Sequence, residues 1–372
     1  MKAIVSVIND LSTDQRVHKV CTTLHKLGYD VTLVGRKQRK SLPLTKRDYY
    51  TTRMFLLFEQ GPLFYAEYQL RLFFYLLFHK AGALVSNDLD TLLPNYLISK
   101  IKSSHIVYDS HELFCEVPEL QSRPVKKKIW KRIERWIFPK LKNVFTVNDS
   151  IAKMYSDEYK VNLHVLRNVP LLSAQKNIHE QSKTELSLPV DKKIIVLQGA
   201  GINIHRGAEE AVQAMQYVNN AVLIIIGGGD VIAILKQMII DLKLADKVKF
   251  IGKVPFEKLL QYTRHADLGL TLDKDTNINY RYSLPNKLFD YIHAGVPVLS
   301  SDLVEIKKII TQYNIGDCID GHDPKHIADK INKILSDETL LQTWKKNCVI
   351  AAGDLNWEKE EEQLINVYKQ FL

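Results

Sequence analysis

Short apolar runs alternate with segments of helical periodicity along both halves of the chain. Runs of four to six apolar residues, such as residues 222–226, are typical of parallel strands that are buried on both faces. The alternation therefore predicts an α/β fold in which helices cover parallel sheets. A chain of 372 residues is long enough for about two domains of ordinary size, so we expect two sheets.

The strands and helices expected from this pattern fall on either side of a polar stretch without periodicity, residues 172–190. We place the linker there, between a first domain, residues 1–171, and a second domain, residues 191–354. Apolar residues at helical spacing predict a terminal helix in residues 355–372. The predicted strands are 3–8, 31–34, 83–85, 106–108, 144–147, 193–197, 222–226, 248–251, 268–272 and 296–299, and the main helices of the first domain are 14–27, 92–102 and 124–142.

The net charge of +9 and the pI near 9.1 indicate an anionic partner. Charge alone does not distinguish nucleotide phosphates, lipid headgroups and nucleic acid. We predict no nucleic-acid partner, because the sequence has no helix-turn-helix, RNA-recognition or zinc-finger pattern. The four cysteines lie far apart and are expected to be free thiols. The first apolar run is broken by Asn9 and Asp10, which predicts a buried strand, no signal peptide and a cytoplasmic protein.

Residues 283–299 combine a turn, a short amphipathic helix, a Gly-x-Pro turn and an apolar strand. Backbone N–H groups of Leu284, Asn286 and Lys287 would be unpaired donors at the start of the helix, and the Lys287 ammonium adds positive charge. This end of the helix is therefore predicted to bind phosphate. Asp290 lies one turn later and offers a carboxylate that accepts hydrogen bonds from ribose hydroxyls. Together these features indicate a nucleotide ligand.

Two glycine-rich turns follow predicted strands of the second domain. Gly227-Gly-Gly-Asp230 has the position at which a Rossmann-like half holds a nucleotide, although such turns also serve tight geometry where no ligand binds. The other turn, residues 199–207, carries Arg206, whose planar cation suits a diphosphate. Ligands bind at the carboxyl ends of strands in open α/β sheets, so these residues are expected to converge: Gly201, Arg206, Gly228, Lys287 and Asp290.

The pair Arg206-Gly207, the turn at Gly227 and residues 284–298 resemble, in order and spacing, the family 4 glycosyltransferases of GT-B architecture. Residues 107–114 and 144–150 resemble the first domain of the same family. The resemblance implies two Rossmann-like domains that face each other across a cleft, with the C-terminal helix returning to the first domain. It also implies transfer of a sugar from a nucleotide sugar to an acceptor, usually with retention and without a bound metal.

The family pattern assigns roles to individual residues of this chain. Asp290 matches the acidic residue that binds ribose, and Tyr282 stands where the family has an acidic residue that contacts the donor hexose. A backbone N–H near Ser283, or Asp273 or Asp275, is the expected replacement. Arg206 matches a cation before glycine, and Lys287 would supply the charge of an arginine that is absent near Ala200. His111 matches a histidine that faces the donor sugar, expected here as neutral imidazole; the alternative for a lone histidine is a structural role.

The catalytic residues implied in this way are His111, Arg206 and Lys287, and the donor-binding residues are Gly201, Gly228, Tyr282, Ser283, Leu284 and Asp290. Cations and helix N–H groups would stabilise the charge on the leaving phosphate. That phosphate can take the proton of the acceptor in a retaining transferase, so we expect no dedicated base.

In the loop of residues 9–16, Asp14 and Arg16 are predicted on the acceptor side, with helix capping as the alternative for this loop. Residues 87–90 resemble an Asp-x-Asp metal motif, but their position before a helix is better explained by capping and turn formation. We therefore predict no metal and no cofactor.

Two segments of the first domain could lie on an anionic membrane. In residues 126–142, five apolar residues share a helical face flanked by lysine and arginine, and core packing is the alternative. Residues 61–80 are too short and too often interrupted by charges to span a bilayer and would form an apolar docking patch. We expect these segments at the membrane if the acceptor is lipid-linked.

The function predicted from these features is transfer of a hexose from a nucleoside-diphosphate sugar to a glycan or lipid-linked acceptor in surface polysaccharide or glycoconjugate biosynthesis. The alternative is a non-catalytic GT-B partner subunit or nucleotide-sugar-binding protein, suggested by Tyr282 and by the arginine absent near Ala200. An epimerase of the same architecture would also bind a nucleotide sugar, but residues 284–298 favour transfer.

Overall fold

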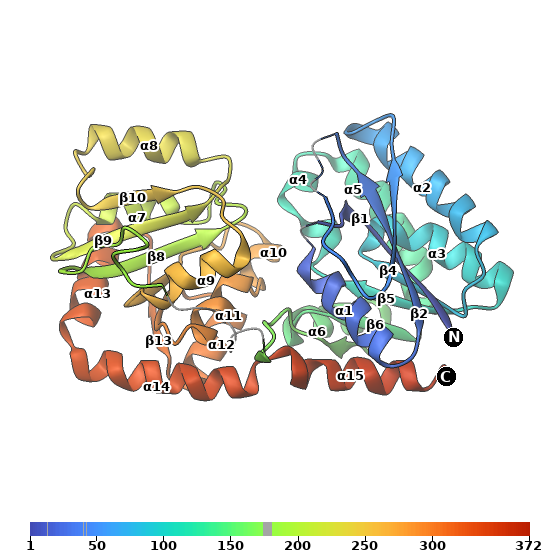
Figure 1. The fold of residues 1–372 in the computed structure, drawn as a ribbon. Coiled ribbons are helices and arrows are strands. Elements are labelled where there is room, and N and C mark those ends of the chain that lie inside the picture. Colours follow the sequence, from blue (N-terminus) through green and yellow to red (C-terminus); the bar gives the residue numbers. More distant parts are fainter. Residues whose placement is uncertain (13, 40, 42, 174–180) are drawn as a thin grey trace. The chain divides into compact units, whose positions relative to one another are not determined.

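The computed structural model describes residues 1–372 except residues 13, 40, 42 and 174–180. The chain divides into two compact units (Figure 1). Unit 1 comprises Met1–Asn168 and Glu360–Leu372, and unit 2 comprises Val169–Lys359. Residues 174–180 of the predicted linker lie outside the described residues.

Unit 1 is built on a seven-stranded parallel sheet. The chain runs outward from β1 to β2 and β3 and then returns to the other side of β1 with β4, so the strand order reverses between β1 and β4. In open α/β sheets this switch point is where the carboxyl ends of the strands leave room for a ligand. The strand order is β3 (Tyr50–Phe55), β2 (Asp30–Lys37), β1 (Lys2–Asp10), β4 (Ala83–Asn87), β5 (His105–Ser110), β6 (Asn143–Thr146) and β7 (His164–Val165).

The helix α2 (Gly61–Phe78) shows how the helices of unit 1 cover the sheet. Phe64, Tyr68, Leu72 and Leu76 recur every four residues and are buried against apolar residues of β1, β2 and β4. The Tyr68 hydroxyl donates to Val7 O at 2.7 Å, which fixes the helix to the central strand. The other helices of this unit are α1 (Gln15–Lys26), α3 (Leu89–Lys102), α4 (Pro118–Gln121), α5 (Pro124–Ile137) and α6 (Asp149–Tyr159), with short 3-10 turns at Phe114–Glu116 and Phe138–Lys140.

Unit 2 has a six-stranded sheet, also parallel, whose order reverses between β8 and β11. The strand β9 is buried along almost its whole length, as expected for a parallel strand covered on both faces. The order is β10 (Val248–Ile251), β9 (Ala221–Gly227), β8 (Lys193–Gly199), β11 (Leu268–Thr271), β12 (Val298–Ser301) and β13 (Gly316–Ile319).

The helices of unit 2 alternate with these strands, and apolar residues of α7, α8 and α13 form one core with β8, β9 and β11. The last helix, α15 (Trp357–Lys369), begins in unit 2 and ends in the segment Glu360–Leu372 of unit 1. The other helices are α7 (Ala208–Ala214), α8 (Ile232–Asp241), α9 (Phe256–Arg264), α10 (Ile278–Arg281), α11 (Asn286–His293), α12 (Val304–Tyr313), α13 (Pro324–Ser336) and α14 (Glu338–Asp354).

The predicted α/β class with two parallel sheets is confirmed, and most of the predicted strands are present within one or two residues. The prediction missed the strands β3, β7 and β13 and, in unit 1, the helices α2, α4 and α6. It also extended the helix of residues 124–142 too far, because α5 ends at Ile137 and a 3-10 turn containing Pro139 follows. Among the described residues, no helix is long and apolar enough to cross a membrane.

Candidate functional site

The candidate site in unit 2 centres on Asp273, which directly follows β11 and is completely buried. Arg206 Nη1 donates to its Oδ1 at 2.9 Å, and Lys287 Nζ lies 3.2 Å from its Oδ2. Thr271 Oγ1 donates to the same Oδ2 at 3.2 Å. The two cations predicted from distant parts of the sequence are therefore held together by one carboxylate.

Electrostatic attraction favours the charged forms of Asp273 and Arg206. Burial would raise the pKa of Asp273, but attraction to Lys287 and Arg206 outweighs it and lowers the pKa. Burial would lower the pKa of Arg206, and Asp273 reverses the effect and raises it. Because two positive charges meet one negative charge, the cluster carries a net charge of about +1 that is available to an anion. The Arg206 guanidinium also lies over the Tyr280 ring, 4.4 Å from its centroid.

The two glycine-rich turns of unit 2 pack directly on each other. Gly228 N donates to Gly199 O at 3.2 Å, and Ile202 N donates to Gly228 O at 2.8 Å. A Cβ atom at Gly227 would collide with Gly199 O, and one at Gly229 would collide with Ile202 O. The close packing of these turns thus explains the glycines at 227 and 229 without a ligand, which was the alternative reading of this motif.

The other glycines of these turns face different surroundings. Gly207 has a φ of 73°, and a Cβ atom there would collide with Leu272 O. At Gly228 the added atom would meet the side chain of Lys253, and at Gly201 it would meet only Asn203 at 3.5 Å or more. At Gly201 and Gly228, therefore, contacts with the neighbouring backbone do not explain why the residue is glycine. Both remain predicted donor-binding residues.

The structure changes three details at the start of α11. The helix begins at Asn286 with Pro285 as its N-cap, so Leu284 precedes the helix rather than forming part of its first turn. The Ser283 N–H donates to Tyr280 O at 3.1 Å, and the Ser283 hydroxyl donates to the same oxygen at 2.9 Å. Tyr282 N donates to Ile278 O at 3.3 Å. The backbone N–H of Ser283 is thus engaged within the protein, against the expectation that it replaces the family carboxylate.

Asp290 is half-buried at the carboxyl end of β8, where Gln198 Nε2 donates to its Oδ2 at 3.1 Å. Gln198 Oε1 in turn accepts from Thr263 Oγ1 at 2.7 Å, which fixes the amide. The next residue, Tyr291, is fully buried and donates to Val196 O and Leu270 O, so it anchors α11 at the β8–β11 switch point. This anchoring orients the Asp290 carboxylate at the edge where a ligand is expected.

The candidate site in unit 1 contains His111, which follows β5 and lies between two carboxylates. Its Nδ1 is 3.3 Å from Asp88 Oδ2, its Nε2 is 3.4 Å from Asp109 Oδ2, and its backbone N–H donates to Asp88 Oδ1 at 2.8 Å. Burial would lower the pKa of His111, but Asp88 and Asp109 outweigh it and raise the pKa to about 9. The imidazole is therefore cationic at neutral pH, which corrects the expectation of a neutral ring.

Asp88 adopts an unusual backbone conformation, with φ 58° and ψ 169°. This region is occupied almost only by glycine, so a non-glycine residue there stores strain. The Asp88 side chain makes no capping hydrogen bond to α3, contrary to the capping explanation of residues 87–90. The carboxylate instead holds the backbone and the ring of His111.

Asp14 and Arg16 are less exposed to an acceptor than predicted. Asp14 is the N-cap of α1 and accepts from Val17 N at 3.1 Å, which is the capping role left open as an alternative. The Arg16 guanidinium is 3% exposed and donates to both oxygens of Asp109, at 3.0 and 2.6 Å, and to Leu166 O at 2.7 Å. Arg16 therefore positions Asp109, which lies against His111, and its guanidinium is not presented at the surface.

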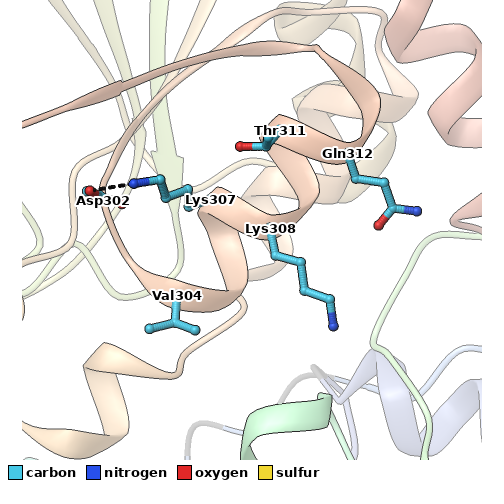
Figure 2. A pocket seen from close by; sticks show the side chains of 6 residues that line it. All are labelled: Asp302, Val304, Lys307, Lys308, Thr311 and Gln312. Atoms are coloured by element: carbon cyan, nitrogen blue, oxygen red, sulfur yellow. Dashed lines mark hydrogen bonds and ion pairs between the residues drawn. The ribbon is translucent and has the colours of Figure 1, made fainter.

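No set of three His, Cys, Asp or Glu side chains in the described part of the chain is arranged to hold a metal ion. A pocket of about 650 Å³ lies on α12 in unit 2, and in it the Lys307 ammonium points to Asp302 at 2.9 Å (Figure 2). None of the predicted site residues lines this pocket. The site is thus defined by the strand ends and not by this surface hollow.

Residues 179–349, which include Asp273 and both cations, match the family model of glycosyl transferases group 1. The second half of the chain is therefore similar to group 1 glycosyltransferases.

Solved structures share the fold over the whole chain, and curated relatives match about half of it. A D-inositol 3-phosphate glycosyltransferase from Xylanimonas cellulosilytica is 22% identical over 50% of this chain and 45% of its own length. The chain thus matches about half the length of such curated relatives. A sucrose-phosphate synthase from Thermosynechococcus elongatus superposes with a TM-score of 0.81 at 17% identity, covering 100% of this chain and 98% of that one. The Anabaena protein HepE in complex with UDP-glucose gives a TM-score of 0.74 at 13% identity, covering 100% of both chains. The fold is that of GT-B glycosyltransferases.

Sequence reasoning missed or misread four residues that organise the two candidate sites. Asp273 was considered only as a replacement contact to the sugar, and its position directly after a buried strand was the available signal. Tyr280 and Gln198 were not considered, because neither belongs to a recognisable motif. Asp88 was treated as part of a turn, and no sequence signal links it to a histidine that follows the next strand.

Proposed function

We propose that the protein is a glycosyltransferase that moves a hexose from a nucleoside-diphosphate sugar to a glycan or lipid-linked acceptor, with retention and without a metal. The observation that carries this proposal is the pairing of Arg206 and Lys287 on Asp273, beside the Asp290 carboxylate, at the carboxyl edge of the sheet in the half of the chain that is similar to group 1 glycosyltransferases. HepE, which shares the fold, forms complexes with UDP and UDP-glucose.

The chemistry proposed for these residues follows from the charges that form during transfer. Cleavage of the bond between sugar and diphosphate leaves negative charge on the diphosphate, and fixed cations lower the barrier by stabilising that charge. Arg206 offers a planar donor set for two phosphate oxygens, and Lys287 adds a point charge. Asp273 holds both cations in place before the substrate arrives, so little reorganisation is needed.

Asp290 is proposed to accept hydrogen bonds from ribose hydroxyls, with Gln198 fixing its orientation. His111 is proposed to donate a hydrogen bond to the donor sugar as an imidazolium, since Asp88 and Asp109 favour its charged form. The acceptor hydroxyl loses its proton to the leaving phosphate, so no residue is assigned as a general base.

A donor screen tests this proposal. The purified protein is heated with UDP-, GDP-, ADP-, dTDP- and CMP-sugars, and donor breakdown is followed in parallel. A ligand at 100 times its Kd stabilises the folded state by about 2.7 kcal/mol. We expect one nucleotide class to raise the Tm of the wild type and to have no effect on Arg206→Ala or Asp290→Ala. Lys307→Ala is the control, because Lys307 pairs with Asp302 at the exposed surface and neither residue is a predicted site residue.

The outcomes separate the proposal from its alternative. Binding with slow donor breakdown supports a transferase. Binding without turnover, even with a membrane extract as acceptor source, would favour a non-catalytic nucleotide-sugar-binding protein, which Tyr282 and the engaged N–H of Ser283 also suggest. The site itself is wrong if no donor binds.

We also propose that unit 1 associates with an anionic membrane surface through α5. Its apolar residues do not all lie on one face: Trp130 and Ile137 are buried, as the core-packing alternative expects, while Ile129 and Trp136 are exposed. The exposed residues Val125, Ile129 and Trp136 alternate along the helix with the exposed cations Lys128 and Arg132. Apolar and basic residues on one exposed helical face are typical of interfacial helices.

The second predicted segment supports the same proposal, since α2 exposes Leu63, Leu70, Phe74 and Phe78 on the side opposite its buried stripe. Flotation with liposomes that contain or lack phosphatidylglycerol tests it. We expect binding only to the anionic liposomes, and weaker binding for Lys128→Glu/Arg132→Glu than for the control Lys333→Glu/Lys346→Glu in unit 2. Equal flotation of the two double variants would count against α5.

A further inference from the structure

Arg36 lies at the carboxyl end of β2 in unit 1 and plays no part in the chemistry described so far. Its guanidinium carbon is 4.7 Å from the centre of the Phe64 ring on α2, so the cation lies over an aromatic surface. Its Nε is buried, and among the described residues no atom accepts a hydrogen bond from it. This half-buried arginine thus has a buried N–H donor without a hydrogen-bond partner among the described residues.

The carboxyl group of Asp90, in the first turn of α3, lies within electrostatic reach of Arg36. Asp90 is 5% exposed, and its Oδ1 has no hydrogen-bond partner among the described residues. Burial and the neighbouring Asp88 raise its pKa well above the usual range, although His111 and Arg36 act in the opposite direction. The neutral form of Asp90 has one O–H donor and leaves the charge of Arg36 uncompensated.

Gln69 on α2 completes the group. Its Nε2 donates to Asp90 O, which ties α2 to the start of α3, while its Oε1 is buried without a partner in the described part of the chain. Tyr65, one turn earlier, interacts electrostatically with both Asp90 and Arg36. Three side chains from β2, α2 and α3 thus bring together buried polar atoms that lack partners.

Buried polar atoms without partners are rare in native proteins and indicate a bound water, ion or ligand. The donors and acceptors of this group indicate which ligand fits. A guanidinium without a counter-ion favours two oxygens of a phosphate or carboxylate. The O–H of Asp90 and the carbonyl of Gln69 match hydroxyl groups, which both donate and accept. The strand β4, which leads into Asp90, borders the switch point of the sheet in unit 1.

We propose that Arg36, Gln69 and Asp90 form an acceptor subsite in unit 1 that binds a sugar or other polyol carrying an oxyanion group, either phosphate or carboxylate. The oxyanion lies against the guanidinium of Arg36, and neighbouring hydroxyls bind to Gln69 and Asp90. This subsite deepens the proposed function, since it specifies the chemical class of the acceptor, but its binding can be measured without a donor.

Isothermal titration of the full chain in the absence of any donor tests the subsite. The probes are glucose 6-phosphate, glucuronate, inorganic phosphate and glucose. We expect the wild type to bind glucose 6-phosphate or glucuronate at least tenfold more tightly than glucose, and the better of the two identifies the oxyanion. Tighter binding of glucose 6-phosphate than of inorganic phosphate would show that the hydroxyls contribute.

The variants separate a ligand site from a structural role. Arg36→Gln is expected to remove the preference for the oxyanion, whereas Arg39→Gln should retain it, because the Arg39 side chain is 79% exposed and pairs with Glu59. Asp90→Asn keeps an uncharged hydrogen-bonding group and should bind within a few-fold of wild type, while Asp90→Ala should weaken all the sugar probes. Thermal unfolding of each variant, and of Arg36→Met as a second replacement, identifies variants that do not fold.

The proposal is overturned if no probe binds, if Arg36→Gln and Arg36→Met bind the anionic sugars as tightly as wild type, or if glucose binds equally well. These results would leave the donor screen unaffected. A protein that binds and breaks down a donor but shows no oxyanion preference refutes the subsite alone, and one that binds no donor refutes the proposed function.

Discussion

Replacing Asp109 by leucine tests the buried ion pair that supports the edge of the sheet in unit 1. The side chains of Arg16 and Asp109 are 3% and 4% exposed, and two hydrogen bonds of 3.0 and 2.6 Å join them. Loss of one partner leaves the other charge buried without compensation, which costs about 3–5 kcal/mol. The change also removes one of the two carboxylates beside His111, so that only Asp88 remains.

This free energy predicts a large shift in the unfolding temperature. Unit 1 contains about 180 residues, and for a domain of this size 1 kcal/mol shifts the Tm by about 2–4 °C. The transition of unit 1 should therefore move down by about 6–20 °C in Asp109→Leu. Differential scanning calorimetry of the full chain measures this shift, and the transition that moves identifies unit 1.

A double-mutant cycle isolates the pair from other effects of the substitution. Arg16→Met removes the other charge, and the variant Arg16→Met/Asp109→Leu replaces both by apolar side chains. We expect the double variant to be more stable than the sum of the two single effects predicts, with a coupling energy of about 2 kcal/mol. The exposed pair of Lys153 and Asp157, with side chains 77% and 67% exposed, provides the control. Asp157→Asn should change the Tm by about 2 °C or less.

Additive single effects would refute this reasoning, because they would mean that the two charges do not depend on each other. A Tm of Asp109→Leu close to that of Asp157→Asn would show that the buried pair contributes no more than a surface pair. Either result would also remove the support that Arg16 is inferred to give to His111 through Asp109.

Three further predictions concern stability. In the folded protein the pKa of His111 is raised to about 9, from an unfolded value near 6.5. This shift should contribute about 3 kcal/mol to the free energy of unfolding, fully present below pH 6.5 and lost as the pH rises to 9. The midpoint of urea unfolding should show this loss in the wild type and not in His111→Asn. Gly207→Ala should lower the free energy of unfolding by at least about 2 kcal/mol, because φ is 73° and the Cβ would collide with Leu272 O, whereas Gly252→Ala, with open space around it, should change it little. Asn148→Ala should cost about 1 kcal/mol in urea unfolding through loss of the cap that accepts from Ile151 N at 2.9 Å.

Each of these predictions has a result that contradicts it. Parallel pH curves for wild type and His111→Asn would mean that the imidazole gains no charge on folding. Equal stability of the two alanine variants would show that the loop at Gly207 moves away from Leu272 at little cost. An unchanged midpoint for Asn148→Ala would mean that water or another group caps α6 as well as the amide does.

The sequence predicted those parts of the fold whose signal is local. The strands β1, β8 and β9 are continuous apolar runs and were located within about two residues. The strand β3 was missed because it lies at the edge of its sheet and carries exposed polar residues, so neither apolar alternation nor a buried run marks it. The helix α2 was missed because it carries apolar residues on all its faces. The buried residues at every fourth position can be told from the exposed ones only when the sheet is known.

The same limit applies to the candidate site. Arg206 and Lys287 were recognisable because each belongs to a local motif, but their common partner Asp273 follows from the order of the strands. The charge of His111 depends on Asp88, which lies on the neighbouring strand end and is brought near by pairing of β4 with β5. The Ser283 N–H is unavailable to a ligand because it donates to Tyr280 O in α10. This helix has four residues, too few for a helical periodicity to be detected in the sequence.

At Asp88 the conformation of the backbone and the role of the side chain favour different residues. A glycine at this position would relieve the strain, because it adopts φ 58° and ψ 169° without steric cost, but it would also remove the carboxylate that holds His111. Relief of the backbone strain and loss of this carboxylate therefore act in opposite directions on the stability of Asp88→Gly, whereas selection for transfer should eliminate the variant. Position 88 is where a survey of tolerated substitutions would separate the requirements of folding from those of activity.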